Sequence, residues 1–307
     1  MKKINLYFNE KFSSTFIVFF RIAIGLLVLI HFLSYWNDFE LLYTDKSIVP
    51  IELHSLHRNY DIITINDILS FINIYFSNDV SIGVFKYFYI ILCIFIVVGF
   101  FSRISALVLM FLQVSFIKYA SLLYYGADFF TTMSLFYVFL FPTSSYFSLQ
   151  KKYFQKSLRL LPKQSLTLSK RLIQIHLCIA YFFSGLDKVI GYNWWNGEAV
   201  WKAMHLPNFD HFIVLSDYIT SPIFYIFIGW ATIIIELLYP IFINFDKTRK
   251  LWLILTILMH IGIIVSFNLF FFSAIMITWN LTSYYFNYYE KSDFKIPSAN
   301  PVSIVKS

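Results

Sequence analysis

Lys188 is the residue whose type and position point most directly to chemistry. It ends an apolar run, and the segment Tyr181–Trp201 (YFFSGLDKVIGYNWWNGEAVW) places an acid, an amine and several aromatic residues together. Desolvation at the mouth of a membrane helix favours the neutral form of a lysine, which could then accept a proton from a substrate. In the alternative interpretation the ammonium reaches the membrane interface on its aliphatic stem, and Trp194, Trp195 and Trp201 are interface residues.

Other ionisable side chains also lie in or at the ends of apolar runs. A charged residue costs about 2.5–3.5 kcal/mol at the centre of a membrane helix unless it is partnered, so we expect these side chains to face the interior of a helix bundle. Glu236, in the otherwise apolar Ile233–Pro240, could pair with Lys188, Arg21 or a histidine. Such a pair is either a tether between helices or part of a catalytic or ligand site. The whole group comprises Arg21, His31, Lys118, Asp128, His176, Asp187, Glu236 and His260.

His176 precedes Lys188 on the same apolar run. The two are about 120° apart around a helix at 100° per residue, so they could border one cavity without touching. No two histidines of the apolar runs occur at the close helical spacing of a metal motif. His54 and His57 are close in sequence but lie in a loop without other nearby ligands, and we predict no metal site. We expect His31, His176 and His260 to be hydrogen-bonded residues of the bundle.

The composition places these residues in a membrane protein. The chain has 307 residues, of which 59% are hydrophobic and 13% charged, and its mean hydropathy is +0.67. This is too apolar for an ordinary soluble domain, and both cysteines lie in apolar runs, which excludes a disulfide framework. We predict an all-α, polytopic bundle of about eight transmembrane helices. The predicted spans are Thr15–Trp36, Phe85–Phe101, Ile104–Ala120, Phe129–Phe141, Leu172–Asp187, Ile223–Phe245, Leu251–Ser266 and Leu269–Tyr285.

The basic residues predict the orientation of the bundle. With eight spans, seventeen Lys and Arg residues outside the spans fall on one side and four on the other. Cytoplasmic loops are enriched in Lys and Arg, so both termini should be cytoplasmic and Lys188 should lie at the exterior end. The net charge of +7 is then a consequence of topology, and no nucleic-acid partner is implied. We therefore divide the chain into a cytoplasmic N-terminus (1–14), one transmembrane domain (15–285) and a cytoplasmic polar tail (286–307).

Two long exterior loops, Asn37–Gly83 and Val189–Pro222, should gather extramembrane mass at the Lys188 end. Within the first loop, Ile65, Leu69 and Ile72 recur at helical spacing. This pattern predicts either an amphipathic helix in the membrane interface or a packed lid helix.

Several short motifs occur in one order along most of the chain, and together they resemble the HTTM family, the membrane domain shared with vitamin K-dependent gamma-carboxylases. The match begins in the first predicted span and ends in the last ones. The matching pieces are Arg21-Ile-Ala-Ile-Gly25, Leu42-Tyr-Thr-Asp45, Pro50, Gly99-Phe-Phe-Ser-Arg103, Gly126-Ala-Asp-Phe-Phe130, Phe139-Leu-Phe-Pro142, the Tyr181–Trp201 segment, Glu236-Leu-Leu-Tyr-Pro240 and His260.

The resemblance implies a chemistry for Lys188. The carboxylases oxygenate reduced vitamin K with O2 and use the strong base that results to carboxylate peptide glutamates with CO2. A lysine just after a Tyr-Phe-x-x-Gly stretch deprotonates the hydroquinone in those enzymes, and Lys188 occupies the matching place. His260 matches a family histidine. The carboxylases continue into a large extramembrane domain, whereas only residues 286–307 follow Tyr285 here, which puts full carboxylase activity in doubt.

Two functional hypotheses follow. In the first, Lys188, Glu236 and His260 are catalytic and act on reduced vitamin K or menaquinone. In one version of this hypothesis the reaction is coupled to modification of a peptide. The quinol would be bound by Trp194, Trp195, Trp201, His176, Asp187, Asp128 and Arg21. In the second, the chain is a non-catalytic accessory factor for maturation or export of a secreted, toxin-like peptide, similar in layout to the sporulation-delaying protein B type. A third possibility, a transporter, is less favoured, because the sequence shows no inverted repeat of the kind expected in transporters. In either case we expect a protein of the bacterial cytoplasmic membrane, in contact with the lipid bilayer, whose functional face is exterior.

Overall fold

The computed structural model describes residues 10, 12–44, 46–48, 63–120, 124–153, 164–206 and 217–286, and all regular structure in these residues is helical. Six helices are long and apolar enough to cross a membrane, which confirms an all-helical chain with membrane-spanning segments. They are α2 (Thr15–Ser34), α6 (Asn78–Val98), α7 (Ser102–Tyr119), α10 (Gln164–Ile190), α13 (Pro222–Phe242) and α14 (Asp246–Phe267).

Each of the eight predicted spans overlaps one helix. The remaining two helices, α8 (Gly126–Leu140) and α15 (Phe270–Tyr284), have 15 residues each. This is shorter than the roughly 20 residues that cross a bilayer without tilt or thinning. Eight crossings, and the cytoplasmic position of both termini, therefore remain predictions. Most of the predicted terminal segments, together with Asp45 and Pro50, lie outside the described residues.

Two spans begin at least seven residues earlier than predicted. α6 starts at Asn78 rather than Phe85, because the Asp79 side chain in its first turn suits the positive end of the helix dipole. α10 starts at Gln164 rather than Leu172, within the basic stretch before the predicted span. Polar residues in its first turns are buried because they have partners: the Thr167 hydroxyl donates to the Glu10 carbonyl, and Lys170 Nζ lies 2.5 Å from the Phe286 carbonyl oxygen.

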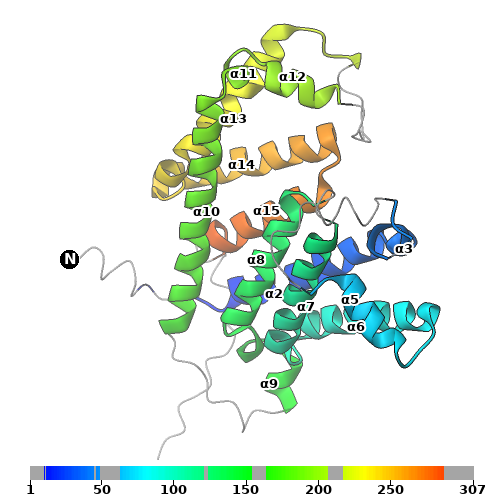
Figure 1. The fold of residues 1–307 in the computed structure, drawn as a ribbon. Helices are drawn as coiled ribbons and strands as arrows, with labels where there is room; N and C mark the ends of the chain where they lie inside the picture. Colours follow the sequence, from blue (N-terminus) through cyan, green and yellow to red (C-terminus); the bar gives the residue numbers. More distant parts are fainter. Residues whose placement is uncertain are drawn as a thin grey trace, which may run out of the picture.

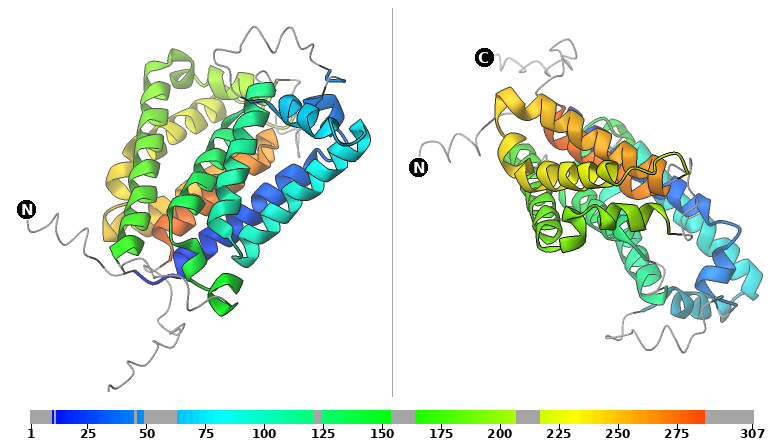
Figure 2. Two further views of the ribbon diagram at one scale, coloured as in Figure 1. Left: turned by 60° about the horizontal axis from the view of Figure 1, so that its bottom comes forward. Right: turned by 90° about the horizontal axis from the view of Figure 1, so that it is seen from above.

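The long helices form one bundle. Figure 1 shows α10 along one side of the molecule, where it packs against α13 and α15, while α6 lies on the opposite side. The helices that overlap the predicted spans, α8 and α15 included, alternate in direction along the chain (Figure 2, left). Trp279 of α15 is fully buried near the centre, and its indole nitrogen donates to the Ser134 hydroxyl of α8 at 2.8 Å.

Short helices gather at the two ends of the bundle. At one end lie α3 (Phe39–Tyr43), α5 (Ile65–Asn73), α11 (Tyr192–Trp195) and α12 (Glu198–Met204). At the other end lies α9 (Leu149–Tyr153) (Figure 2, left). The described helices of the two loops predicted as exterior therefore lie at the same end of the bundle.

The helix predicted in the first exterior loop is present as α5. The Thr64 and Asp67 side chains form a capping box at its N-terminus, and its Ile65 and Leu69 side chains are buried against the bundle. Phe71 is exposed on the other face. α5 is therefore packed on the protein through one face, and its contact with a membrane interface remains a prediction.

Candidate functional site

A close contact between α10 and α13 positions the candidate site. A Cβ atom at Gly185 would lie 2.5 Å from the backbone nitrogen of Leu237, so only glycine fits at this point of α10. The two helix backbones therefore touch one turn below Lys188 and directly beside Glu236. This contact explains why side chains from two distant spans meet here.

Lys188 and Glu236 form an ion pair at this contact. Lys188 Nζ lies 2.7 Å from Glu236 Oε2, and the two side chains are only 15% and 9% exposed. The ammonium also donates to the Ser184 hydroxyl at 2.7 Å and lies 5.0 Å from the centre of the Trp194 ring. A carboxylate, a hydroxyl and the face of an aromatic ring thus surround the Lys188 Nζ atom. Of the partners predicted for Glu236, Lys188 is the one observed.

The segment after α10 folds over the ion pair. Gly197, at φ +79°, makes the turn between α11 and α12, and it lies so close to the backbone of Ile226 that a Cβ would come within 2.6 Å of the amide nitrogen. The Trp195 indole donates to the Val189 carbonyl at 2.7 Å and packs edge-on against Trp230 of α13. These contacts hold α11, and with it Trp194, beside Lys188.

A second polar cluster lies deeper in the bundle. Asn280 of α15 uses both N–H groups, donating to the Tyr181 hydroxyl and to the Met276 carbonyl, each at 2.9 Å. Its carbonyl oxygen accepts from the Tyr239 hydroxyl at 2.7 Å. The Tyr181 hydroxyl then has one proton left to donate, and His260 Nε2 lies 2.8 Å from it. When the Tyr181 hydroxyl donates this proton to Nε2, the His260 imidazole carries its own proton on Nδ1.

His260 Nδ1 is buried and has no hydrogen-bond partner among the described residues. An unsatisfied buried donor costs about 1–3 kcal/mol, so such an atom marks a place where a ligand atom or a water can bind. Tyr181 lies two turns before Lys188, on the same face of α10 and about 10 Å along its axis. The two clusters consequently follow each other along one face of α10, with Glu236 within electrostatic range of the Tyr181 hydroxyl.

The structure places the other predicted site residues elsewhere. His176 Nδ1 is hydrogen-bonded to the Tyr137 hydroxyl at 2.9 Å, on the side of α10 that faces α8. Asp128 caps α8, accepting from the Tyr125 amide and the Gln113 side chain. Neither residue meets the Lys188–Glu236 pair.

Arg21, Asp187 and Trp201 are also separate from the ion pair. Arg21 is buried and donates to backbone carbonyls after α8, at Thr143, Tyr146 and Phe147. The Asp187 side chain is exposed. Trp201 is 46% exposed and stacks on His205, with 4.3 Å between ring centres.

Four residues of the clusters were not among the predicted site residues: Ser184, Tyr181, Tyr239 and Asn280. They are uncharged, and a search for ionisable groups in apolar runs passes over them. Asn280 nevertheless carried a signal, because a side-chain amide in an apolar run needs partners as much as a charge does.

An exposed ion pair lies close to the buried one. On α12, Lys202 Nζ contacts Glu198 Oε1 at 2.6 Å, with side chains 56% and 40% exposed. The hydrogen bond from Lys202, followed by one from Asn196, lowers the pKa of Glu198. This pair has the same chemistry as Lys188–Glu236 in a solvated place, and it provides a matched control.

No protein-family model, curated protein or solved structure matches this chain. Membership of the HTTM family therefore remains a prediction from the motifs.

Proposed function

We propose that this protein is a membrane-embedded, gamma-carboxylase-like enzyme that takes a proton from the hydroxyl group of a reduced quinone at the Lys188–Glu236 pair. The observation that carries the proposal is the pair itself, two partly desolvated ionisable groups 2.7 Å apart beside the face of Trp194. Buried, paired ionisable groups of this kind occur at catalytic sites, and tethers between helices use them too.

The ion pair refines the role that the family resemblance gives to Lys188. An ammonium cannot accept a proton, so the accepting group of the charged pair is the Glu236 carboxylate. Lys188 then faces the developing phenolate and stabilises its negative charge. Lys188 is the base itself only when its own proton has first moved to Glu236. In both cases the two residues accept one proton as a unit.

Two features of the site suit a quinol. The aromatic face of Trp194 offers a stacking surface next to the ammonium, and the proton on His260 Nδ1 is a free donor for an oxygen atom. A bound quinol would supply the electrons for the reaction with O2 that the family resemblance implies.

Epoxide formation tests the proposal. We would incubate the purified protein with reduced menaquinone or vitamin K under oxygen and quantify the quinone epoxide by mass spectrometry. Lys188→Ala and Glu236→Gln should abolish epoxide formation, whereas Lys202→Ala, from the exposed pair, should leave it unchanged. Folded protein that forms no epoxide with any of several quinols would overturn the proposal.

A non-catalytic accessory factor for a secreted peptide is the second candidate function. It is favoured by large apolar side chains exposed around α11 and α12, a surface on which a peptide could dock. Lys188–Glu236 would then be a tether, so Lys188→Arg should preserve function, whereas a role that requires a neutral amine would be lost. The exposed side chains include Ile190, Tyr192, Trp201 and Tyr218.

The six apolar helices indicate an integral membrane protein in contact with lipid. We further propose that it resides in a bacterial cytoplasmic membrane with the Lys188 end outside. The distribution of basic residues supports this orientation.

A further inference from the structure

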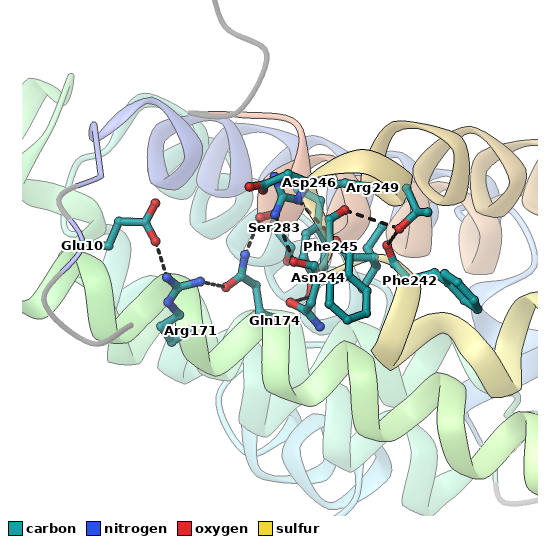
Figure 3. Close-up of polar contacts among 12 residues, drawn as sticks. Glu10, Arg171, Gln174, Phe242, Asn244, Phe245, Asp246, Arg249 and Ser283 are labelled. Atoms are coloured by element: carbon teal, nitrogen blue, oxygen red, sulfur yellow. Dashed lines mark hydrogen bonds and ion pairs between the residues drawn. The ribbon is translucent and has the colours of Figure 1, made fainter. Parts of the chain in front are cut away.

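A cavity of about 830 Å³ lies along α10 at the end of the bundle away from Lys188. α10, the turn from α13 to α14 and the segment before α2 form its walls. Figure 3 shows the polar contacts of residues that line it, among them Arg171, Gln174 and Arg249. Lys188, Glu236 and His260 do not line this cavity. An inference drawn from it is therefore independent of the proposed enzymatic function.

Two arginines and two carboxylates meet at the polar end of the cavity. Arg171 pairs with Glu10 and donates to the Gln174 side chain at 2.7 Å, while Arg249 Nη1 lies 2.7 Å from Asp246 Oδ1. Both arginine side chains are at least nine-tenths buried, whereas the Glu10 and Asp246 side chains are 46% and 90% exposed. The positive groups are thus fixed within the protein and the negative groups lie toward the outside (Figure 3).

Beyond this polar end, the α10 side of the cavity is apolar. Ile175, Ile179, Phe182 and Phe183 of α10 line it and are 40–61% exposed. From Arg171 to Phe183 the helix rises about 18 Å. This length is close to the ~15 Å depth of one leaflet, half of a hydrocarbon core of about 30 Å. Charges at the interface and an apolar wall through one leaflet match the shape of a lipid.

We propose that this cavity binds one zwitterionic phospholipid whose headgroup carries a primary ammonium. The phosphate would contact Arg171 and Arg249, the ammonium would contact Glu10 and Asp246, and one acyl chain would lie along the apolar wall. The four charged residues sum to zero net charge, with the arginines buried and their paired carboxylates closer to the surface, which complements a zwitterion better than an anion. By the predicted orientation, the lipid belongs to the cytoplasmic leaflet.

Native mass spectrometry of the full chain tests this assignment. Detergent-solubilised protein would be mixed with phosphatidylethanolamine, phosphatidylglycerol and phosphatidylcholine of identical acyl chains, and separately with inorganic phosphate. We expect one molecule of phosphatidylethanolamine to be retained in preference to the other two lipids, and inorganic phosphate not to bind. Equal retention of all three lipids, a preference for another headgroup, or phosphate binding as strong as lipid binding would each overturn the proposal.

Three variants keep the test specific. Ile179→Trp fills the apolar wall and should lower lipid occupancy roughly tenfold. Ile254→Trp, at a similarly exposed isoleucine of α14 outside the cavity, should leave it unchanged. Glu10→Gln removes one carboxylate from a partly exposed position and should shift the preference from phosphatidylethanolamine toward phosphatidylglycerol. Unchanged occupancy in Ile179→Trp, or an unchanged preference in Glu10→Gln, would refute the assignment.

Discussion

Burying either Lys188 or Glu236 without the other would cost free energy, because an unpaired charge would lose its hydration. Each loses hydration in the bundle, and their mutual contact at 2.7 Å, with the Ser184 hydroxyl, compensates for that loss. The same contact makes them a proton-accepting unit in the proposed reaction. Stability and function can therefore be separated by comparing variants that remove one partner with variants that remove both.

Lys188→Ala should destabilise the protein by about 3–5 kcal/mol, because it leaves the Glu236 carboxylate buried and unpaired. Thermal unfolding in detergent measures this effect. Lys202→Ala breaks the exposed pair on α12 and should give no resolvable change. The double variant Lys188→Met/Glu236→Leu should recover most of the lost stability while remaining inactive. Equal melting temperatures for Lys188→Ala and Lys202→Ala would contradict the buried pair.

The direction of the hydrogen bonds around His260 predicts which of its ring nitrogens carries the proton. Nitrogen-15 NMR of histidine-labelled protein should show His260 as neutral imidazole with its proton on Nδ1, assigned by loss of the signal in His260→Gln. Tyr181→Phe removes the donor to Nε2 and should change this signal. Tyr137→Phe, which contacts His176 instead, should not. A proton on Nε2 of His260 in the unsubstituted protein would show that the Tyr181 hydroxyl does not donate to His260.

The sequence predicted part of this chemistry at the level of residues. Lys188 was a candidate because its type and position are visible in the segment itself, and Glu236 because a carboxylate in an apolar run demands a partner. The Tyr181–Asn280–His260 cluster could not be predicted, because its members come from three helices and only the packing of those helices brings them together.

At the scale of elements, the contact between α10 and α13 depends on Gly185. The missing side chain lets two helix backbones touch, and that spacing sets the distance between Lys188 and Glu236. α6 and α10 also show why span boundaries were the weakest predictions. A helix continues beyond its apolar run wherever its polar residues find caps or partners, and hydropathy alone does not record these.

Gly185→Ala should therefore destabilise the protein and weaken epoxide formation, because the new methyl group meets the backbone of Leu237, which cannot move aside without separating the helices. Gly262→Ala is the matched control. It lies within α14 with no atom close enough to meet a Cβ, so alanine should be neutral or stabilise by up to about 1 kcal/mol. Melting temperatures of the two variants measure the difference. A Gly185→Ala protein as stable as Gly262→Ala would contradict the close contact.

At the scale of the whole molecule, alternating apolar runs and basic loops predicted a helical membrane bundle, and six spanning helices confirm this class. Hydropathy predicts this class well because every backbone group in a bilayer must be hydrogen-bonded. An α-helix satisfies all of its backbone groups within one segment. Which residues of different helices meet is a property of packing, and this explains why Arg21, Asp128 and His176 lie away from the ion pair.

The predicted orientation can be tested by labelling single cysteines with a membrane-impermeant maleimide in intact cells, in a background in which Cys93 and Cys178 are both replaced by serine. Tyr192→Cys, exposed at the α11–α12 end, should be labelled from outside. Lys152→Cys, on α9 at the other end, should be labelled only after the membrane is permeabilised. The opposite pattern would invert the topology and place Lys188 on the cytoplasmic side.

The most direct test of the central claim is to supply purified protein and reduced menaquinone with ¹⁸O2 and to look for the heavy isotope in the quinone epoxide. The proposed function predicts labelled epoxide from the unsubstituted protein and from Lys202→Ala, and none from Lys188→Ala. Absence of labelled epoxide from folded, unsubstituted protein with several quinols, or equal labelling in Lys188→Ala, would contradict a quinol-dependent reaction at the Lys188–Glu236 pair.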